Sequence, residues 1–328
     1  MGHNARGALI ALLAFAFYSS HDAVVKTMGA SYSPVQLIFF SVMFSFPLAV
    51  VTIMRDSNPG TLIPVHPRWV LVRTVAAVAT GLSGFYAFSV LPLAQVYTII
   101  FASPLIITLL AIPVLGEKVG LHRGGAIVVG LAGVIFVLQP GNTQLSLGHA
   151  AALVCAFGGS AASIIVRKIG ADERPVVLML YPMLANFVLM GGALAFFYEP
   201  MPIAHLGVIA MMSVLGWVGG LAMIAAYKAG EAAVVAPMQY SQIVWATIFG
   251  LIFFGETLDR TTMIGAGIII ASGLYIVFRE SRGASGLTPV LRTKLRPDTG
   301  TFLKSPRLPE GTARRGIVAL RGRPRRSV

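Results

Sequence analysis

The segment LPLAQVYTIIFASPLIITLLAIPVLGEK, residues Leu91–Lys118, decides the fold because the chain contains it twice. It is apolar, three prolines interrupt it, and it closes on a Gly-Glu pair. Residues Lys228–Thr257, KAGEAAVVAPMQYSQIVWATIFGLIFFGET, repeat the same plan. A constant offset of 139 positions maps Phe101 onto Tyr240 and the first Gly-Glu onto the second. We therefore infer an internal duplication built around an apolar helix that ends in Gly-Glu.

The composition is that of a membrane protein. The 328 residues are 56% hydrophobic and only 11% charged, whereas soluble domains average about 25% charged residues. So few charges cannot cover a surface that faces water, which excludes an ordinary soluble protein. The net charge of +13 comes mostly from the C-terminal end, because residues 1–278 hold 12 Lys/Arg and 9 Asp/Glu while residues 279–328 hold 13 and 3. The single Cys155 excludes a disulfide within the chain.

Stretches without charged residues delimit the membrane spans. Residues 74–116 form one such stretch of 43 residues, which as a helix would be about 64 Å long, twice the roughly 30 Å hydrocarbon core. The stretch must hold two helices, and Leu91-Pro92-Leu93 is the expected turn. The same argument predicts an all-α membrane protein with ten transmembrane helices, at about residues 7–29, 34–54, 69–90, 93–115, 121–138, 148–167, 176–197, 206–227, 231–254 and 261–279.

The distribution of Lys and Arg predicts the orientation of these spans. With the N-terminus inside, ten of the Lys and Arg residues that precede the tail fall on the inner side, and only Lys26 and Arg260 fall on the outer side. The first apolar run leads straight into further spans, so we interpret it as a helix and not as a cleavable signal. We expect a multi-pass protein of the cell inner membrane with both termini in the cytoplasm.

Each copy of the duplication holds five helices, residues 7–138 in the first repeat and residues 148–279 in the second. An odd number of spans forces the second copy to enter the membrane from the opposite side, so the repeats are inverted. Inverted repeats are the recurring plan of secondary transporters, in which the substrate site lies near the midplane between the halves.

Residues 280–328 are rich in Arg, Pro and Gly and lack apolar periodicity, which predicts a disordered basic cytoplasmic tail. Attraction to anionic lipids of the inner leaflet is one interpretation of its charge. The alternative is a solvated tail that only enforces topology. Scattered Arg residues do not predict binding to nucleic acid.

The paired Gly-Glu turns, each between a proline-interrupted helix and a Gly/Ala-rich one, resemble the EamA domain of the drug/metabolite transporter superfamily over about residues 7–278. This resemblance implies a secondary transporter of small metabolites with a central cavity lined by both halves. It also implies that the helices at 121–138 and 261–279 lie at the periphery, where a homodimer contact is one option. The run YAFSVLPLAQVYTIIFASPL looks most like the bacterial riboflavin and S-adenosylmethionine transporters of the family. No G-x-x-x-x-G-K-[ST] loop is present, so we expect no ATPase module and no cofactor.

Two charges in the first span are candidate substrate-binding residues. Asp22 and Lys26 are four residues apart and share a helix face, and charges inside a span are costly enough to suggest function. The alternative is that Lys26 extends to the outer interface with Asp22 as its partner. His21 precedes Asp22, but adjacent helical residues point about 100° apart, so we expect no catalytic dyad and no enzyme. The other histidines show no ligand spacing, and we expect no metal site.

Aromatic and amide side chains supply the other candidates. Tyr97 and Phe101 share one face of the span at 93–115, and Gln242 and Trp245 share one face of the span at 231–254. A planar polar substrate would satisfy buried amides, and the alternative is interhelical hydrogen bonding with ordinary aromatic packing. We expect the two faces to meet across the midplane, with Tyr86, Gln239 and Tyr240 completing the substrate-binding set.

Three prolines are the predicted hinges of alternating access: Pro92, Pro104 and Pro237. The copies differ here, because the first has Ser-Pro where the second has Gln-Ile and an earlier proline. We therefore expect the two halves to bend differently and the site to be asymmetric.

The expected function is a secondary transporter of one small organic metabolite, with riboflavin uptake ranked first. The alternatives are an exporter of amino acids or related metabolites and a transporter of S-adenosylmethionine. A membrane-embedded enzyme would need clustered catalytic residues, and a channel would need a continuous polar lining. The sequence shows neither pattern.

Overall fold

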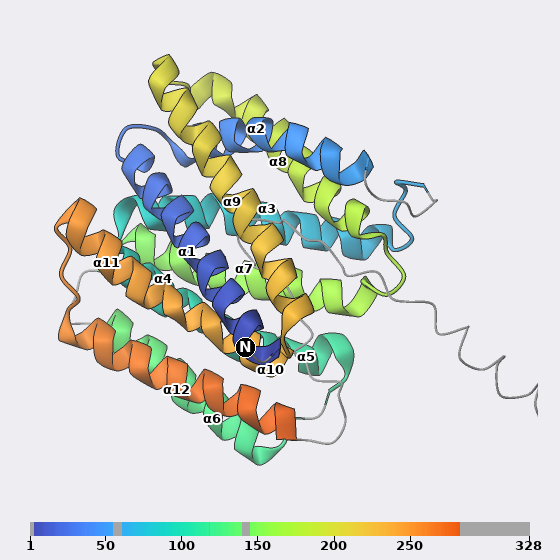
Figure 1. The fold of residues 1–328 in the computed structure, drawn as a ribbon, viewed down its shortest axis with the longest axis vertical. Helices are drawn as coiled ribbons and strands as arrows, with labels where there is room; N and C mark the ends of the chain where they lie inside the picture. Colours follow the sequence, from blue (N-terminus) through green and yellow to red (C-terminus); the bar gives the residue numbers. More distant parts are fainter. Residues whose placement is uncertain (1–2, 55–60, 118, 140–144, 283–328) are drawn as a thin grey trace, which may run out of the picture.

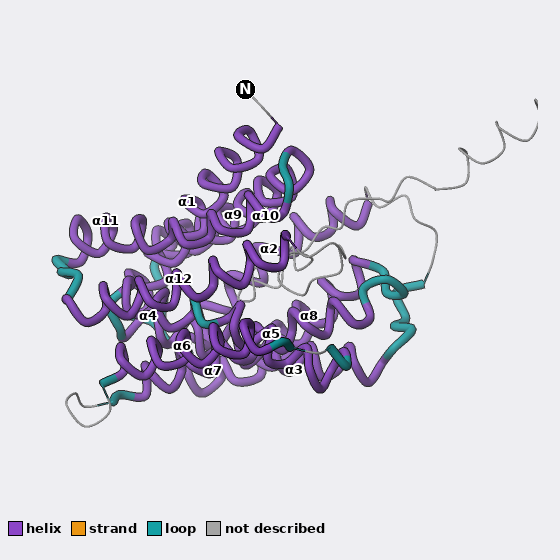
Figure 2. The backbone as a smooth tube through the Cα atoms, turned by 90° about the horizontal axis from the view of Figure 1, so that it is seen from below, coloured by secondary structure: helices purple, strands orange, loops and turns teal. Residues whose placement is uncertain are grey.

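The computed structural model describes residues 3–54, 61–117, 119–139 and 145–282, and every regular element in those ranges is helical (Figure 2). The predicted basic tail falls outside the described residues except for residues 280–282, which continue the last helix. In chain order the elements are α1 (His3–Gly29), α2 (Pro34–Met54), α3 (Pro67–Val90), α4 (Leu93–Ile100), α5 (Ser103–Leu115), α6 (Leu121–Leu138), α7 (Leu147–Ile169), α8 (Pro175–Phe197), α9 (Ile203–Ala229), α10 (Ala232–Val235), the 3-10 helix η1 (Ala236–Ser241), α11 (Gln242–Phe254) and α12 (Arg260–Arg282).

Nine spans in the described residues are long and apolar enough to cross a membrane, and they correspond to nine of the ten predicted helices. The tenth predicted span, over residues 231–254, is divided among α10, η1 and α11. Pro237 lies in the first turn of η1, where its ring and its missing N–H oppose a regular α-helix. The fold class is the predicted all-α membrane protein with two five-helix halves.

The corresponding span of the first half is also broken, between α4 and α5. Pro104 lies in the first turn of α5, a position where a missing N–H costs little. Backbone hydrogen bonds continue through the break. Phe101 N donates to Tyr97 O at 2.8 Å, and Ala102 N donates to Ile99 O at 3.1 Å. The Ser160 hydroxyl on α7 donates to the Ser103 carbonyl at 3.2 Å. Such bonds are required where a helix is interrupted at membrane depth.

Helix packing repeats from one half to the other. α1 packs against α9 just as its copy α7 packs against α3, and α5 packs against α7 just as α11 packs against α1. Two further contacts join copies of the same helix: α2 lies against α8 at one edge of the molecule, and α6 lies against α12 at the opposite edge (Figure 1). Helices that pack against their own copies lie on the pseudo-two-fold axis, so these two edges mark its course through the molecule.

The two Gly-Glu motifs end α5 and α11 in the same way. Gly116 and Gly255 adopt left-handed backbone angles, with φ of 71° and 64°, which favour glycine at a helix C-cap. The next amide then folds back, so that Glu117 N donates to Ala111 O at 3.3 Å and Glu256 N donates to Gly250 O at 2.9 Å. The motif therefore fixes the direction in which each glutamate leaves its helix.

Close packing between α6 and α12 depends on glycine. A Cβ atom placed on Gly265 would overlap the Val137 side chain and lie 3.2 Å from the Gly133 carbonyl, whereas a Cβ on Gly267 would meet nothing within 4 Å. The apolar side chains on the outside of this pair, including Val128 and Met263, are exposed, as expected for a surface that faces lipid.

We predict that Gly265→Ala lowers the free energy of unfolding by about 1–3 kcal/mol, because the added methyl group overpacks the contact between α6 and α12. The matched variant Gly267→Ala on the same helix should be nearly neutral. Thermal unfolding of the purified protein in detergent measures both. Equal melting temperatures for the two variants would contradict the described packing.

Candidate functional site

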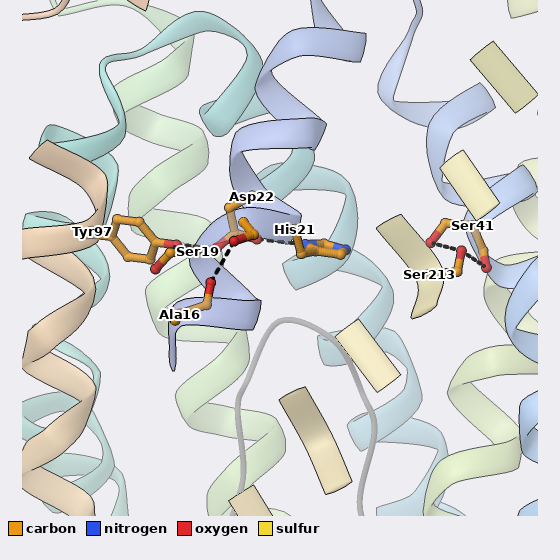
Figure 3. Close-up of polar contacts among 8 residues, drawn as sticks. Ala16, Ser19, His21, Asp22, Ser41, Tyr97 and Ser213 are labelled. Atoms are coloured by element: carbon orange, nitrogen blue, oxygen red, sulfur yellow. Dashed lines mark hydrogen bonds and ion pairs between the residues drawn. The ribbon is translucent and has the colours of Figure 1, made fainter. Parts of the chain in front are cut away.

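A cluster of buried polar side chains lies in the C-terminal half of α1 and connects this helix to α4 of the same repeat (Figure 3). The Asp22 carboxylate, 1% exposed, binds His21 Nδ1 through Oδ1 at 2.8 Å. Its Oδ2 accepts a short hydrogen bond from the Tyr97 hydroxyl, which also lies 3.4 Å from Ser19 Oγ. Since Tyr97 belongs to α4, the carboxylate holds two helices together in the interior of the molecule.

Small residues on α9 position this cluster. The Tyr18 ring packs on Gly219, where an added Cβ would lie 2.9 Å from the ring, and His21 packs over Gly216. On its other side His21 meets the Phe85 ring edge-on, with centroids 6.0 Å apart. The His21 ring thus lies between α9 and α3, with Nδ1 facing Asp22.

A column of aromatic rings runs from α3 through α4 to η1. Phe88, Tyr97, Phe101 and Tyr240 follow one another with centroid separations of 5.3, 6.1 and 5.1 Å. All four rings are buried. Phe101 and Tyr240 are copies of each other in the duplication, so their edge-to-face contact lies on the pseudo-two-fold axis.

The second half leaves polar atoms without partners where the first half does not. Gln242 occupies the position equivalent to Ser103, whose hydroxyl donates to Ile100 O at 2.7 Å. The amide Nε2 of Gln242 and the neighbouring Ser241 hydroxyl are buried and have no hydrogen-bond partner among the described residues. A buried donor without a partner is costly, so these atoms suit a ligand that supplies acceptors.

Three of the predicted site residues are brought together: Asp22 binds Tyr97, and the Tyr97 ring stacks on Phe101. Tyr240, and not the Gln242/Trp245 face, meets Phe101 across the axis. The reason is η1, because a 3-10 helix has about three residues per turn and changes which side chains share a face. Trp245 is half-buried, and its ring lies tilted against Phe249 with the centroids 5.9 Å apart. Tyr86 on α3 and Gln239 on η1 are also half-buried.

Lys26 does not pair with Asp22. Its ammonium group binds the Glu256 carboxylate at 2.7 Å and the Leu91 carbonyl at 2.6 Å, close to the end of α1. Of the predicted hinges, Pro92 is the N-cap residue of α4, and Pro104 and Pro237 start the segments after the two breaks.

Sequence reasoning missed several members of these contacts. The sequence predicts no contact for Ser19 or His21 beyond their closeness to Asp22 along the chain, and it indicates for Glu256 only the end of a helix. The duplication could have indicated the ion pair, because both repeats have a cation and a glutamate at equivalent positions. Lys26 maps onto Arg167 at an offset of 141, and Glu256 maps onto Glu117 at an offset of 139. In the described residues no group of three or more His, Cys, Asp or Glu side chains has the geometry of a metal site.

Known proteins resemble this chain along nearly all of the described region. The model of the EamA-like transporter family matches residues 5–139 and 146–278. An S-adenosylmethionine uptake transporter of Rickettsia bellii is 24% identical over 84% of this chain and 94% of its own length. A riboflavin transporter of Rhizobium johnstonii is 26% identical over 84% and 92%. A pseudopaline exporter of Pseudomonas aeruginosa is 24% identical over 84% and 97%.

A solved crystal structure shares the fold with a TM-score of 0.55 and 20% identity, over 85% of this chain and 98% of that one.

We predict that Tyr97→Phe lowers the free energy of unfolding by about 1–3 kcal/mol, because it removes a donor from a buried carboxylate. Tyr275→Phe is the control, since Tyr275 is 43% exposed on α12. Melting temperatures in detergent compare the two. A Tyr97→Phe variant as stable as Tyr275→Phe would show that the hydrogen bond to Asp22 contributes little.

Proposed function

The chain belongs to the EamA-like transporter family, and on that premise we propose that it is a secondary transporter that moves a small organic metabolite across the inner membrane by alternating access. The two inverted halves, residues 7–138 and 148–279, would form the transport unit, with both termini in the cytoplasm. The proposal includes no cofactor and no catalytic step. The homodimer contact at α6 and α12, and the binding of anionic lipids by the basic tail, stay predictions from the sequence.

The cluster of Asp22, His21 and Tyr97 carries this proposal. A carboxylate within a membrane span is expensive, and it is retained where a substrate or a coupling ion needs it. Asp22 lies in the interior of the fold and contacts helix α4 of the same half through Tyr97. A substrate that competes for Tyr97 or His21 would therefore couple its own binding to the separation of α1 from α4.

Riboflavin uptake is the substrate assignment that we rank first. A planar ring system suits the aromatic column, and its carbonyl oxygens suit the unpartnered donors of Ser241 and Gln242. A relative named as a riboflavin transporter is 26% identical to this chain. Export of amino acids or related metabolites, or transport of S-adenosylmethionine, is the alternative, in keeping with relatives named for pseudopaline export and S-adenosylmethionine uptake.

Counterflow into proteoliposomes tests the function. Vesicles with the purified protein are loaded with unlabelled riboflavin, and uptake of labelled riboflavin is followed against vesicles without protein. Stimulated, saturable uptake supports the proposal. Counterflow with S-adenosylmethionine or amino acids alone would replace the substrate assignment, and counterflow with none of them would remove its support.

In the same assay we expect Asp22→Asn to slow counterflow by about ten-fold or more, because the substitution removes a buried charge and replaces one of the two acceptor oxygens with a donor. Asp172→Asn is the matched control, since the Asp172 side chain is 63% exposed in the connection between α7 and α8. Wild-type rates for Asp22→Asn would place the substrate site elsewhere.

We expect Pro237→Ala to lower the maximal rate by about five-fold with a smaller change in KM, because α10, η1 and α11 could then join into one stiffer helix. Pro113→Ala is the control, since Pro113 lies inside α5 and away from the break. The maximal rate and the KM, determined separately for each variant, distinguish a hinge, which changes the maximal rate, from a binding residue, which changes the KM. Unchanged kinetics for Pro237→Ala would rule out the hinge role.

A further inference from the structure

The two nitrogens of the His21 ring have different surroundings. Nδ1 lies 2.8 Å from Asp22 Oδ1, and the other oxygen of this carboxylate accepts a hydrogen bond from the Tyr97 hydroxyl. A carboxylate has only acceptor atoms, so its hydrogen bond with His21 requires a proton on Nδ1. In the neutral ring this leaves Nε2 as a bare acceptor. Since His21 is only 5% exposed, this acceptor is buried.

The helix that faces Nε2 does not supply a donor for it. The nearest position on α9 is Gly216, where an added Cβ would lie 3.9 Å from Nε2 and 3.4 Å from Cδ2 of His21. Ser213, one turn earlier on α9, donates its hydroxyl proton to the carbonyls of Ser41 and Ile209, both at 3.0 Å. Within the part of the chain that the structure describes, His21 Nε2 therefore has no hydrogen-bond partner.

This arrangement favours the neutral ring over the imidazolium form. An imidazolium would bury a charged N–H at Nε2 without an acceptor, which costs more than a neutral acceptor without a donor. The neutral ring still carries a cost, because buried polar atoms in folded proteins normally have a partner. A donor group from outside the chain would remove that cost.

Nε2 also lies where the two halves of the molecule meet. α1 belongs to the first half and packs against α9 of the second. In Figure 3 the His21 ring points away from Tyr97 and toward the side on which Ser213 and Ser41 lie. The edge-on contact with Phe85 places α3 on another side of the ring. In transporters built from inverted repeats, the boundary between the halves is where the substrate binds.

We propose that His21 Nε2 is the acceptor for an N–H or O–H group of the transported molecule, and that Asp22 is a positioning residue that acts through His21. Asp22 holds the proton on Nδ1, Tyr97 holds Asp22, and the Nε2 lone pair then meets the substrate. This inference rests on the proposed transport function. It does not depend on the substrate ranking, since riboflavin, amino acids and S-adenosylmethionine all carry such donor groups.

Nitrogen NMR tests the position of the proton without any substrate. The protein is labelled with ¹⁵N-histidine and measured in detergent in a mildly alkaline buffer, where nitrogens with and without a proton have well-separated shifts. The chain has six histidines, and His21→Asn identifies the His21 signals by their loss. We expect a protonated Nδ1 and a bare Nε2. A proton on Nε2, alone or together with one on Nδ1, would overturn the proposal.

The same spectra test the positioning role of Asp22. In Asp22→Asn the side chain can donate to Nδ1, so we expect the His21 proton to shift from Nδ1 toward Nε2. Asp172→Asn is the control and should leave the His21 signals unchanged, because the Asp172 side chain is 63% exposed. A merely structural role would not move the proton. If the proton stays on Nδ1 in Asp22→Asn, Asp22 is not the positioning residue.

Two substitutions at His21 separate its two nitrogens in the counterflow assay. The shorter amide of His21→Asn can keep a donor near the Nδ1 position but has no atom at Nε2, whereas His21→Gln can place its amide oxygen near Nε2. We expect His21→Asn to raise the KM by about ten-fold and His21→Gln by about three-fold, with smaller changes in the maximal rate. His122→Asn is the control, since His122 is exposed at the start of α6.

The ranking of the two variants decides which nitrogen matters for transport. A wild-type KM for His21→Asn, or a larger defect for His21→Gln than for His21→Asn, would overturn the proposal. The NMR result does not involve transport, so the two arms fail separately. Absence of counterflow with every compound would contradict the proposed function, and the spectra would still support or overturn the tautomer. Counterflow with a proton on Nε2 would contradict this inference alone.

Discussion

Phe101 and Tyr240 occupy the same position in the two copies of the duplication, and their rings are in contact at 5.1 Å. Residues related by a two-fold axis can touch each other only at that axis, so this contact fixes where the two halves meet. Both helix breaks lie next to it, one between α4 and α5 and the other in η1. Tyr97 stacks on Phe101 and hydrogen-bonds Asp22, so the buried carboxylate also depends on this central contact.

The broken helices show how a membrane interior constrains a backbone that is not regular. Each interruption frees carbonyl and amide groups that lipid cannot satisfy. In the first half Ser160 and the local turn satisfy them. In the second half the 3-10 geometry satisfies the backbone, but the Ser241 hydroxyl and Gln242 Nε2 are buried and find no partner in the part of the chain that the structure describes. The two helix breaks therefore differ in their hydrogen bonding at the point where the two sequences stop being copies.

Much of this architecture could be predicted from the sequence, because hydrocarbon thickness sets span length and the duplication is visible as a constant offset. The shared face of Tyr97 and Phe101 followed from helical periodicity. The 3-10 helix could not be predicted, because Pro237 indicates an interruption of the helix but not the geometry of that interruption. For this reason Phe101 contacts Tyr240, and not the predicted Gln242/Trp245 face. The partner of Lys26 lies 230 positions away, and local periodicity contains no information about contacts at that distance.

The two edges of the molecule carry a mechanical consequence. α2 packs against α8 and α6 packs against α12, and each pair joins copies of one helix (Figure 1). When two inverted halves exchange conformations, contacts between a helix and its own copy are conserved by symmetry, while all other contacts between the halves change places. In the proposed alternating access the two edges would therefore be the pivots about which the interior tilts, and glycines allow the close packing of α6 and α12 at one of them.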